Sequence, residues 1–152
     1  MPNDIPPDQR YRPEDRIMQG VIPYLCLAGK SGEAADFYVR AFGAKDIGRM
    51  PYPDKPGFMH VQVEINGGAL MLTDETGRSS VQGTGNPMPN GHLPPVVPDG
   101  QVWWDRAIGA GCTVVAPFEH QFWGDTWGLL ADPFGLKWAV LTPDPALWDK
   151  SA

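Results

Sequence analysis

The stretch FMHVQVEINGGALMLT, residues 58–73, alternates apolar and polar side chains on either side of Asn66-Gly67. An Asn-Gly pair between two alternating runs is a strong signal of a β-hairpin, because both residues tolerate the positive φ angles of a tight turn. The stretch therefore predicts one strand over 58–65 and a second strand over 69–73.

The predicted hairpin has two unlike faces, since successive side chains of a strand point in opposite directions. One face is wholly apolar and carries Val61, Val63, Ile65, Leu70 and Leu72. The other face is mixed and carries His60, Gln62, Glu64, Met71 and Thr73. We expect the apolar face to pack under a helix. This leaves the mixed face for a ligand or for a network of internally satisfied polar groups.

Two amphipathic helices are predicted at matching positions in the two halves of the chain. The first has Ser31 as its N-cap and ends at Gly43, with apolar side chains at helical intervals between them. The second opens at Asp99 and ends at Gly111. The opening residues lie 68 residues apart, and so do the terminating glycines. This repeated spacing indicates an internal duplication.

The same offset relates the hairpin to a second one. It places the Asn-Gly turn on DPFG (132–135), between alternating runs at 126–131 and 136–141. Proline as the second and glycine as the fourth residue suit a type I turn. One more strand precedes each helix, over 21–27 and over about 92–97. Each half is therefore predicted to have the order strand, helix, strand, strand, strand.

Clusters of proline and the duplication divide the chain into five predicted regions. These are an N-terminal arm (1–18), a first module (19–77), a linker (78–90), a second module (91–143) and a C-terminal tail (144–152). The arm is expected to be loose or to dock on a partner.

The composition favours a folded, soluble protein and excludes several partners. Hydrophobic residues make up 42% of the chain, enough for a core, and the formal net charge is −6. Without clusters of Lys or Arg, such a chain is not expected to bind nucleic acid or an anionic membrane. No apolar run approaches the roughly 20 residues that span a bilayer, and no signal-peptide pattern is present, so we expect a cytoplasmic location. Cys26 and Cys112 are expected to be free thiols.

The chain resembles the vicinal oxygen chelate superfamily, which includes glyoxalase I, extradiol dioxygenases and bleomycin-resistance proteins. The resemblance rests on the duplicated unit and on three pieces, DFYVRAFGA (36–44), NGGALMLTDE (66–75) and FWGDTWGLLADPFGLKW (122–138), which look most like the PhnB-like branch. It covers about residues 20–142. It implies an α+β fold in which two βαβββ modules form a curved mixed-sheet cup, with the helices outside. The mixed face of the first hairpin would then line the cup.

The 68-residue offset also assigns faces to the second hairpin. It places four residues on the face toward the cup: Gly128, Leu130, Ala139 and Leu141. It turns Trp127, Trp138 and Val140 toward a helix, where large aromatic side chains usually pack in a core. Phe122 and Trp123, which precede this hairpin, are candidates for the mouth of the cavity.

Metal-using members of the superfamily place four His or Glu ligands on the first and last strands of each half. The resemblance assigns these positions to Pro23, Met71, His92 and Ala139. Proline and alanine cannot bind a metal, and the methionine thioether is too soft for Zn, Ni, Fe or Mn. Only His92 is retained, so neither a metal nor another cofactor is expected. A rearranged site built from His60, Glu64 and His92 stays open as an alternative.

These observations favour a metal-free protein that binds a small organic molecule in the cup, as the resistance members of the superfamily do when they sequester a compound. The expected ligand contacts are His60, Gln62, Glu64, Met71, Thr73, His92, Phe122, Trp123 and Leu130. The alternative is a lyase, isomerase or dioxygenase that uses a relocated metal or acid/base catalysis by His60. We also expect a homodimer, because superfamily members commonly pair halves within or between chains to close the cup.

Overall fold

The computed structural model describes residues 17–75 and 86–148. In chain order its elements are β1 (Tyr24–Cys26), α1 (Ser31–Phe42), β2 (Lys45–Pro51), β3 (Phe58–Ile65), β4 (Gly68–Thr73), α2 (Gly100–Ala110), β5 (Thr113–His120), β6 (Thr126–Ala131), β7 (Lys137–Thr142) and α3 (Pro145–Trp148). The first half has the predicted order of strand, helix and three strands. The second half repeats it from the helix onward.

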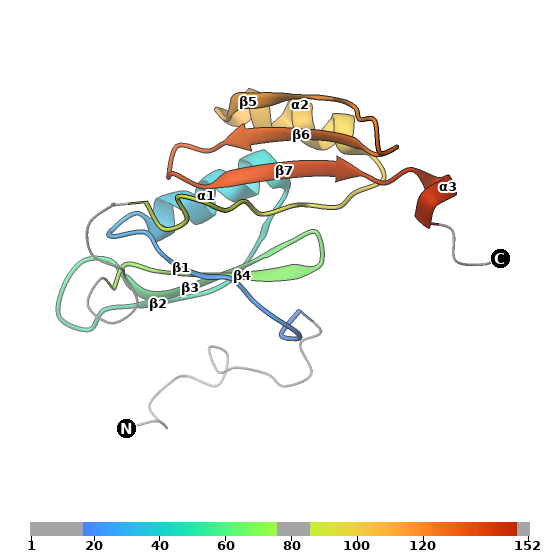
Figure 1. Cartoon of the computed structure of the whole chain (residues 1–152). Coiled ribbons are helices and arrows are strands. Elements are labelled where there is room, and N and C mark those ends of the chain that lie inside the picture. The colour runs from blue at the N-terminus through green and yellow to red at the C-terminus, as the bar shows by residue number, and fades with distance from the viewer. Residues whose placement is uncertain (1–16, 76–85, 149–152) are drawn as a thin grey trace.

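The strands form two curved sheets that do not close into a barrel (Figure 1). The first, called sheet A here, has the order β1-β4-β3-β2, and the second, called sheet B, has the order β5-β6-β7. Strand β1 runs parallel to β4, whereas the other neighbouring strands are antiparallel. The fold is the predicted α+β arrangement of two related modules.

The segment 93–97 lies beside β7 where a fourth strand of sheet B was predicted. Leu93 and Val96 form isolated parallel bridges with Trp138 and Leu141. Backbone hydrogen bonds of 2.9–3.1 Å continue along the segment, so it runs along β7 as β1 runs along β4. It contains two consecutive prolines, which have no N–H group and interrupt a regular ladder. The strand predicted over 92–97 is therefore only partly formed.

Both long helices end as predicted, but the first begins differently. Ser31 is the first helical residue of α1 rather than its N-cap. Its backbone N–H and its hydroxyl both donate to Oδ1 of Asp74, so a carboxylate just after β4 stabilises the helix start. Gly43 ends α1 in the left-handed conformation with φ 63°. Helix α2 follows Asp99 and ends before Gly111.

The hairpin of β3 and β4 has the predicted register and faces. The turn Asn66-Gly67 has φ angles of 52° and 81°, as a tight hairpin turn requires. Val61 lies opposite Leu72, and Gln62 lies opposite Met71. Val61 and Leu72 are fully buried in the core that includes α1. The mixed face that carries Gln62 and Met71 consequently lies on the side of sheet A away from α1.

The second hairpin follows the 68-residue offset on only one strand. Val140 lies 68 residues after Leu72, but Gly128, which is opposite Val140, lies 67 residues after Val61. The turn at 132–136 is longer than the two-residue turn of the first hairpin. A shift of one residue moves every side chain of a strand to the other face. The faces predicted for β6 are therefore reversed.

Three predicted positions on β6 need correction as a result. Gly128 and Leu130 lie on the same face as Trp138, toward the helices, and Leu130 is fully buried rather than exposed to the cup. Trp127 lies on the opposite face, where it is opposite Leu141. On β7, Trp138 and Val140 belong to the core, as predicted, so Ala139 and Leu141 lie on the other face of the strand.

One hydrophobic core joins the two modules, and a buried carboxylate lies within it. Oδ2 of Asp132 accepts hydrogen bonds from the Tyr38 hydroxyl at 2.7 Å and from the Trp138 indole at 2.9 Å. Its Oδ1 accepts the backbone N–H groups of Phe134 and Leu136 at 2.8 and 3.0 Å. Asp132 is only 7% exposed. Its four donors connect α1 of the first module with the turn and β7 of the second.

Pairs of aromatic rings join the helices to the sheets within this core. Phe42 on α1 packs on Trp138 with ring centroids 4.6 Å apart, and it stacks on Trp103 of α2 at 6.3 Å. Trp104 stacks on Phe118 of β5 at 5.5 Å. The expected burial of Trp138 between sheet and helix is confirmed.

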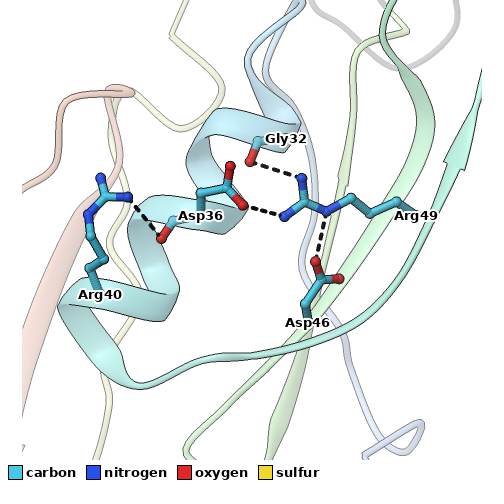
Figure 2. A network of polar contacts seen from close by, with 5 residues as sticks. All are labelled: Gly32, Asp36, Arg40, Asp46 and Arg49. Atoms are coloured by element: carbon cyan, nitrogen blue, oxygen red, sulfur yellow. Dashed lines mark hydrogen bonds and ion pairs between the residues drawn. The ribbon is translucent and has the colours of Figure 1, made fainter.

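The edge strand β2 is attached to α1 through Arg49 (Figure 2). The guanidinium donates to the Asp46 and Asp36 carboxylates at 2.8 and 2.6 Å and to the Gly32 carbonyl at 3.4 Å. Arg40 donates to the backbone carbonyl of Asp36. Exposed ion pairs contribute about 0–1 kcal/mol each, so this cluster mainly positions β2. Arg49 lies opposite Val61, and its charge is therefore on the helix side of sheet A.

Several predicted regions fall largely outside the described residues. Residues 1–16 of the arm, 78–85 of the linker and 149–152 of the tail are not described. Cys26 and Cys112 are free thiols, as expected. Within the described ranges, no helix has the length and apolar character needed to cross a membrane.

Replacing Asp132 by Ala should destabilise the protein by about 2–4 kcal/mol, because several buried donors then lose their acceptor. Tyr38→Phe removes one donor and leaves the carboxylate with three others, so it should cost about 1 kcal/mol. Urea unfolding of both variants measures the difference. Equal losses in the two variants would contradict the role assigned to Asp132.

The hydrogen bonds that the Asp74 carboxylate accepts should make the stability of the protein depend on pH. Burial alone would raise the pKa of Asp74, but hydrogen bonds from Ser31 and Phe58 lower it below its usual value. Stability from this carboxylate is present above its unfolded pKa of about 3.9 and is lost as the pH falls through the lowered folded pKa. Wild type should therefore exceed Asp74→Asn in Tm near pH 7, and this advantage should shrink at about pH 3. The exposed Asp54→Asn control should show no such pH-dependent difference.

Candidate functional site

The open face of sheet A brings together most of the polar side chains predicted to contact a ligand. Strand register arranges the centre of this face in two rows across the four strands. One row holds Tyr24, Met71, Gln62 and Gly48, and the other holds Cys26, Thr73, His60 and Met50. Neither row contains a charged carboxylate, Lys or Arg side chain. The face is therefore polar at its centre and rich in sulfur, but not strongly charged.

Tyr24 and His60 form a pair across the two rows. Their rings are stacked with centroids 5.6 Å apart, and the Tyr24 hydroxyl lies 3.3 Å from Nδ1 of His60. Burial lowers the pKa of His60 below its usual value, although a hydrogen bond with Gln62 opposes that shift. The imidazole is therefore neutral at physiological pH. A neutral imidazole and a phenol can each donate or accept a hydrogen bond, so the pair can recognise an uncharged polar group.

Gln62 lies at the centre of the same face and is covered there by Met18. Its Nε2 donates to the sulfur of Met18 at 3.1 Å, and the residue is 9% exposed. Met18 belongs to the segment before β1, which therefore lies over part of the predicted ligand face. The described end of the predicted arm thus contributes a side chain to this site.

Two other predicted contacts on this sheet, Thr73 and Glu64, are not part of the group formed by Tyr24, His60 and Gln62. Thr73 is buried, and its hydroxyl donates to the Met59 carbonyl while accepting the N–H of Glu75, so it is satisfied at the end of the strand. Glu64 lines a separate groove of about 440 Å³. The groove lies between the modules and also contains Lys45, Trp103 and Arg106. Among the described residues, the hydrogen bond of His60 to Tyr24 is present and no hydrogen bond joins His60 to Glu64.

Sheet B contributes aromatic side chains in the loop before β6. Phe122 is 97% exposed and packs edge-on against Trp123, which in turn contacts Trp127. This position agrees with a place at the rim rather than in the core. Leu130, by contrast, is part of the core and cannot contact a ligand on the open face.

The side chains at the four positions that the resemblance assigns to metal ligands do not together fit a metal site. The Pro23 carbonyl accepts the N–H of Met71, so these two positions are neighbours in sheet A. In sheet B the corresponding hydrogen bond runs from the N–H of Ala139 to the Leu93 carbonyl, so Leu93 and not His92 is the neighbour of Ala139. His92 precedes Leu93 and is exposed. A pyrrolidine, a thioether and a methyl group do not fit Zn²⁺, Ni²⁺, Fe²⁺ or Mn²⁺.

A rearranged metal site also lacks support in the geometry. Within residues 17–75 and 86–148, no three His, Cys, Asp or Glu side chains gather closely enough to hold a metal ion. His60, Glu64 and His92 are therefore not brought together. Burial raises the pKa of Cys112 to about 12, which keeps this thiol protonated and unreactive at neutral pH.

A groove of about 380 Å³ lies where the two modules meet beside β1 and β4. Its lining is mainly apolar and includes Pro23, Leu70, Leu93, Pro94, Val96 and Trp138. The Asn66 side chain donates to the Val96 carbonyl at 2.9 Å and connects the two sheets there.

Sequence reasoning did not identify Tyr24 or Met18 as site residues. Tyr24 follows Pro23 directly on β1, and the strand alternation that found His60 and Gln62 could have found it. No sequence pattern identifies Met18, because it lies outside the helices and strands and its contact with Gln62 depends on the tertiary fold.

Comparison with known proteins agrees with this fold. A model of the Glyoxalase/Bleomycin resistance protein/Dioxygenase superfamily matches residues 24–140. An uncharacterised protein of Mycobacterium bovis is 38% identical over 125 residues, which cover 80% of this chain and 81% of that protein. Such a match over most of both chains indicates common descent and a common fold.

Solved structures show the same architecture at lower identity. Protein PA1353 from Pseudomonas aeruginosa has a TM-score of 0.66 at 24% identity, covering 82% of this chain and 98% of that one. The PhnB protein from Bacillus cereus has a TM-score of 0.64 at 19% identity, covering 82% and 99%. At these identities the likeness concerns the fold alone. Together with the family match, it shows that the chain belongs to the Glyoxalase/Bleomycin resistance protein/Dioxygenase superfamily.

Proposed function

We propose that this protein binds a small, largely apolar organic molecule on the open face of sheet A, without a metal, in the cytoplasm. The observation that carries the proposal is the uncharged polar group formed by Tyr24, His60 and Gln62. Sulfur atoms of Met71, Met50 and Cys26 belong to side chains in the same two rows. A few directed polar groups within an apolar surface are typical of sites for small organic ligands.

The ligand set of the family is replaced in a way that suits binding better than metal catalysis. Met71 offers a polarizable thioether that packs well against aromatic rings. Pro23 and Ala139 offer only apolar surface. These substitutions convert a set of metal positions into positions that can contact the body of an organic molecule.

We also propose that a second copy of the chain completes the cup. Each sheet has one face away from the helices, and the two sheets of one chain do not close around a cavity. Phe122 is almost fully exposed, and Tyr24, Val96 and Trp123 are each more than one third exposed. Exposed apolar side chains of this size often mark a protein interface. A homodimer that places sheet A of one copy against sheet B of the other would enclose the ligand.

The second candidate function is catalysis by His60, as a lyase or isomerase. The lowered pKa of His60 and its contact with Tyr24 favour it, because a neutral imidazole held by a phenol can accept a proton from a substrate. A relocated metal has weaker support, since the described residues do not gather a third ligand beside His60.

Calorimetric titration with Zn²⁺, Ni²⁺, Mn²⁺ and Fe²⁺ should show no stoichiometric binding, because the family positions hold no suitable donors. A small-molecule library screened by thermal shift should instead yield neutral ligands. At about 100 times its Kd, such a ligand stabilises by about 2.7 kcal/mol, which raises Tm by roughly 5–10 °C in a chain of this size.

The shift should be reduced in His60→Ala and in Tyr24→Ala, and it should persist in the control Ile108→Ala on the outer side of α2. One tightly bound metal per chain, lost in His60→Ala, would overturn metal-free binding and favour the enzymatic candidate. Equal ligand responses in all three variants would place the ligand elsewhere.

Light scattering coupled to size exclusion should give about twice the chain mass of 16.6 kDa. Trp123→Glu places a charge on the exposed rim and should shift the protein toward monomer, whereas Ile108→Glu should leave it dimeric. A wild-type protein that is monomeric at micromolar concentration would refute the proposed dimer.

A further inference from the structure

The hydrogen bond between Gln62 and Met18 pairs a strong donor with a weak acceptor. Nε2 of Gln62 donates to the Met18 sulfur at 3.1 Å, although Gln62 is only 9% exposed and has little access to water. A thioether sulfur accepts hydrogen bonds weakly. An oxygen acceptor at the position of this sulfur would satisfy the amide better.

Among the described residues, the segment that carries Met18 makes few backbone hydrogen bonds to sheet A. Within the described ranges, the first backbone hydrogen bond of the chain is the one that the Pro23 carbonyl accepts from Met71. Gly20 has a φ of 66° and open space around its Cα, and Val21 is 99% exposed. Among the described residues, the hydrogen bond from Gln62 is the polar contact that holds the Met18 side chain on sheet A.

The surroundings of Gln62 indicate what could replace the sulfur. Tyr24, opposite Met71, offers a ring face, and His60 is stacked beside it. The charged pair Lys45 and Glu64 lies in the next row, where the two residues are opposite each other. An anion would lose its hydration without gaining a cation in the two central rows, so the face suits an uncharged molecule.

We propose that Met18 is a displaceable plug, which occupies the place that a neutral acceptor oxygen of the ligand takes on Gln62. This inference rests on the proposed function and gives it a ligand class. The ligand is an uncharged molecule with a planar apolar body and a carbonyl or ether oxygen. On binding, its oxygen accepts the Gln62 amide, its body packs on Tyr24 and Met71, and Met18 moves away from the sheet.

The fluorescent dye prodan tests the proposal, because it is a neutral planar naphthalene ketone. Met18→Ala should bind prodan about three- to tenfold more tightly than wild type, since the ligand no longer competes with the plug. The control Met59→Ala removes a methionine that lies outside the two central rows, and its affinity should equal that of wild type. Dimethylaminonaphthoate, which has the same ring system with a carboxylate in place of the ketone, should bind more weakly than prodan to all three proteins.

A double variant isolates the role of the amide. Gln62→Leu should weaken prodan binding, and Met18→Ala should no longer increase the affinity in that background. In methionine methyl NMR of the wild type, saturating prodan should move the Met18 signal toward its position in an unfolded peptide. A Met18 signal that stays ordered and shows contacts to the dye would make Met18 a wall of the site and overturn the plug.

The outcomes separate this inference from the proposed function. If wild type binds prodan and Met18→Ala binds it equally or more weakly, the plug is wrong while ligand binding on sheet A stands. If neither protein binds prodan, the plug and its ligand class are both wrong. If the compound library also yields no ligand whose effect depends on His60 and Tyr24, the proposed function fails with them.

Discussion

The buried carboxylate of Asp132 is the interaction on which the arrangement of the two modules depends. It accepts donors from α1, from β7 and from its own turn, and it lies inside a core made of aromatic rings from both halves. A carboxylate removed from water is tolerated only when its lone pairs are satisfied, so the donors have to stay in place. The orientation of α1 against sheet B follows from this requirement. Because α1 also covers the apolar face of sheet A, the face that carries Tyr24 and His60 is left open.

The turn that contains Asp132 also explains why the two halves differ in their site residues. It is longer than Asn66-Gly67, and the added length changes the face of every residue on β6. Gly128 then faces the helices, where an added Cβ would meet the Trp104 ring at 2.7 Å, and Trp127 faces outward. The first module consequently offers a polar face with sulfur, whereas the second offers aromatic side chains near its rim. A duplicated fold has thus acquired two unlike surfaces.

The elements of the fold were predictable because local signals and packing agree. Alternation on β3 and β4 and the glycines after α1 and α2 act over a few residues, and the structure keeps each of them. The face of Leu130 was not predictable from a repeat, since one residue in a turn reverses a strand. Candidate residues His60 and Gln62 followed from alternation alone. Met18 could not be found, because its contact with Gln62 joins residues 44 apart through a segment without regular structure.

The central rows of the open face carry uncharged polar and sulfur-containing side chains instead of charged ones, and this determines which interactions the face can make. A divalent metal would have supplied a fixed charge and would have favoured anionic or chelating groups. The central rows carry an imidazole, a phenol, an amide and thioethers, which can interact with a molecule through directed hydrogen bonds and dispersion. Discrimination on such a face depends on satisfying buried polar groups, because an amide left without a good acceptor costs about 1–3 kcal/mol. Under the proposed function, Gln62, whose amide donates to a weakly accepting sulfur, would favour a ligand with a correctly placed oxygen over a purely apolar compound of the same shape.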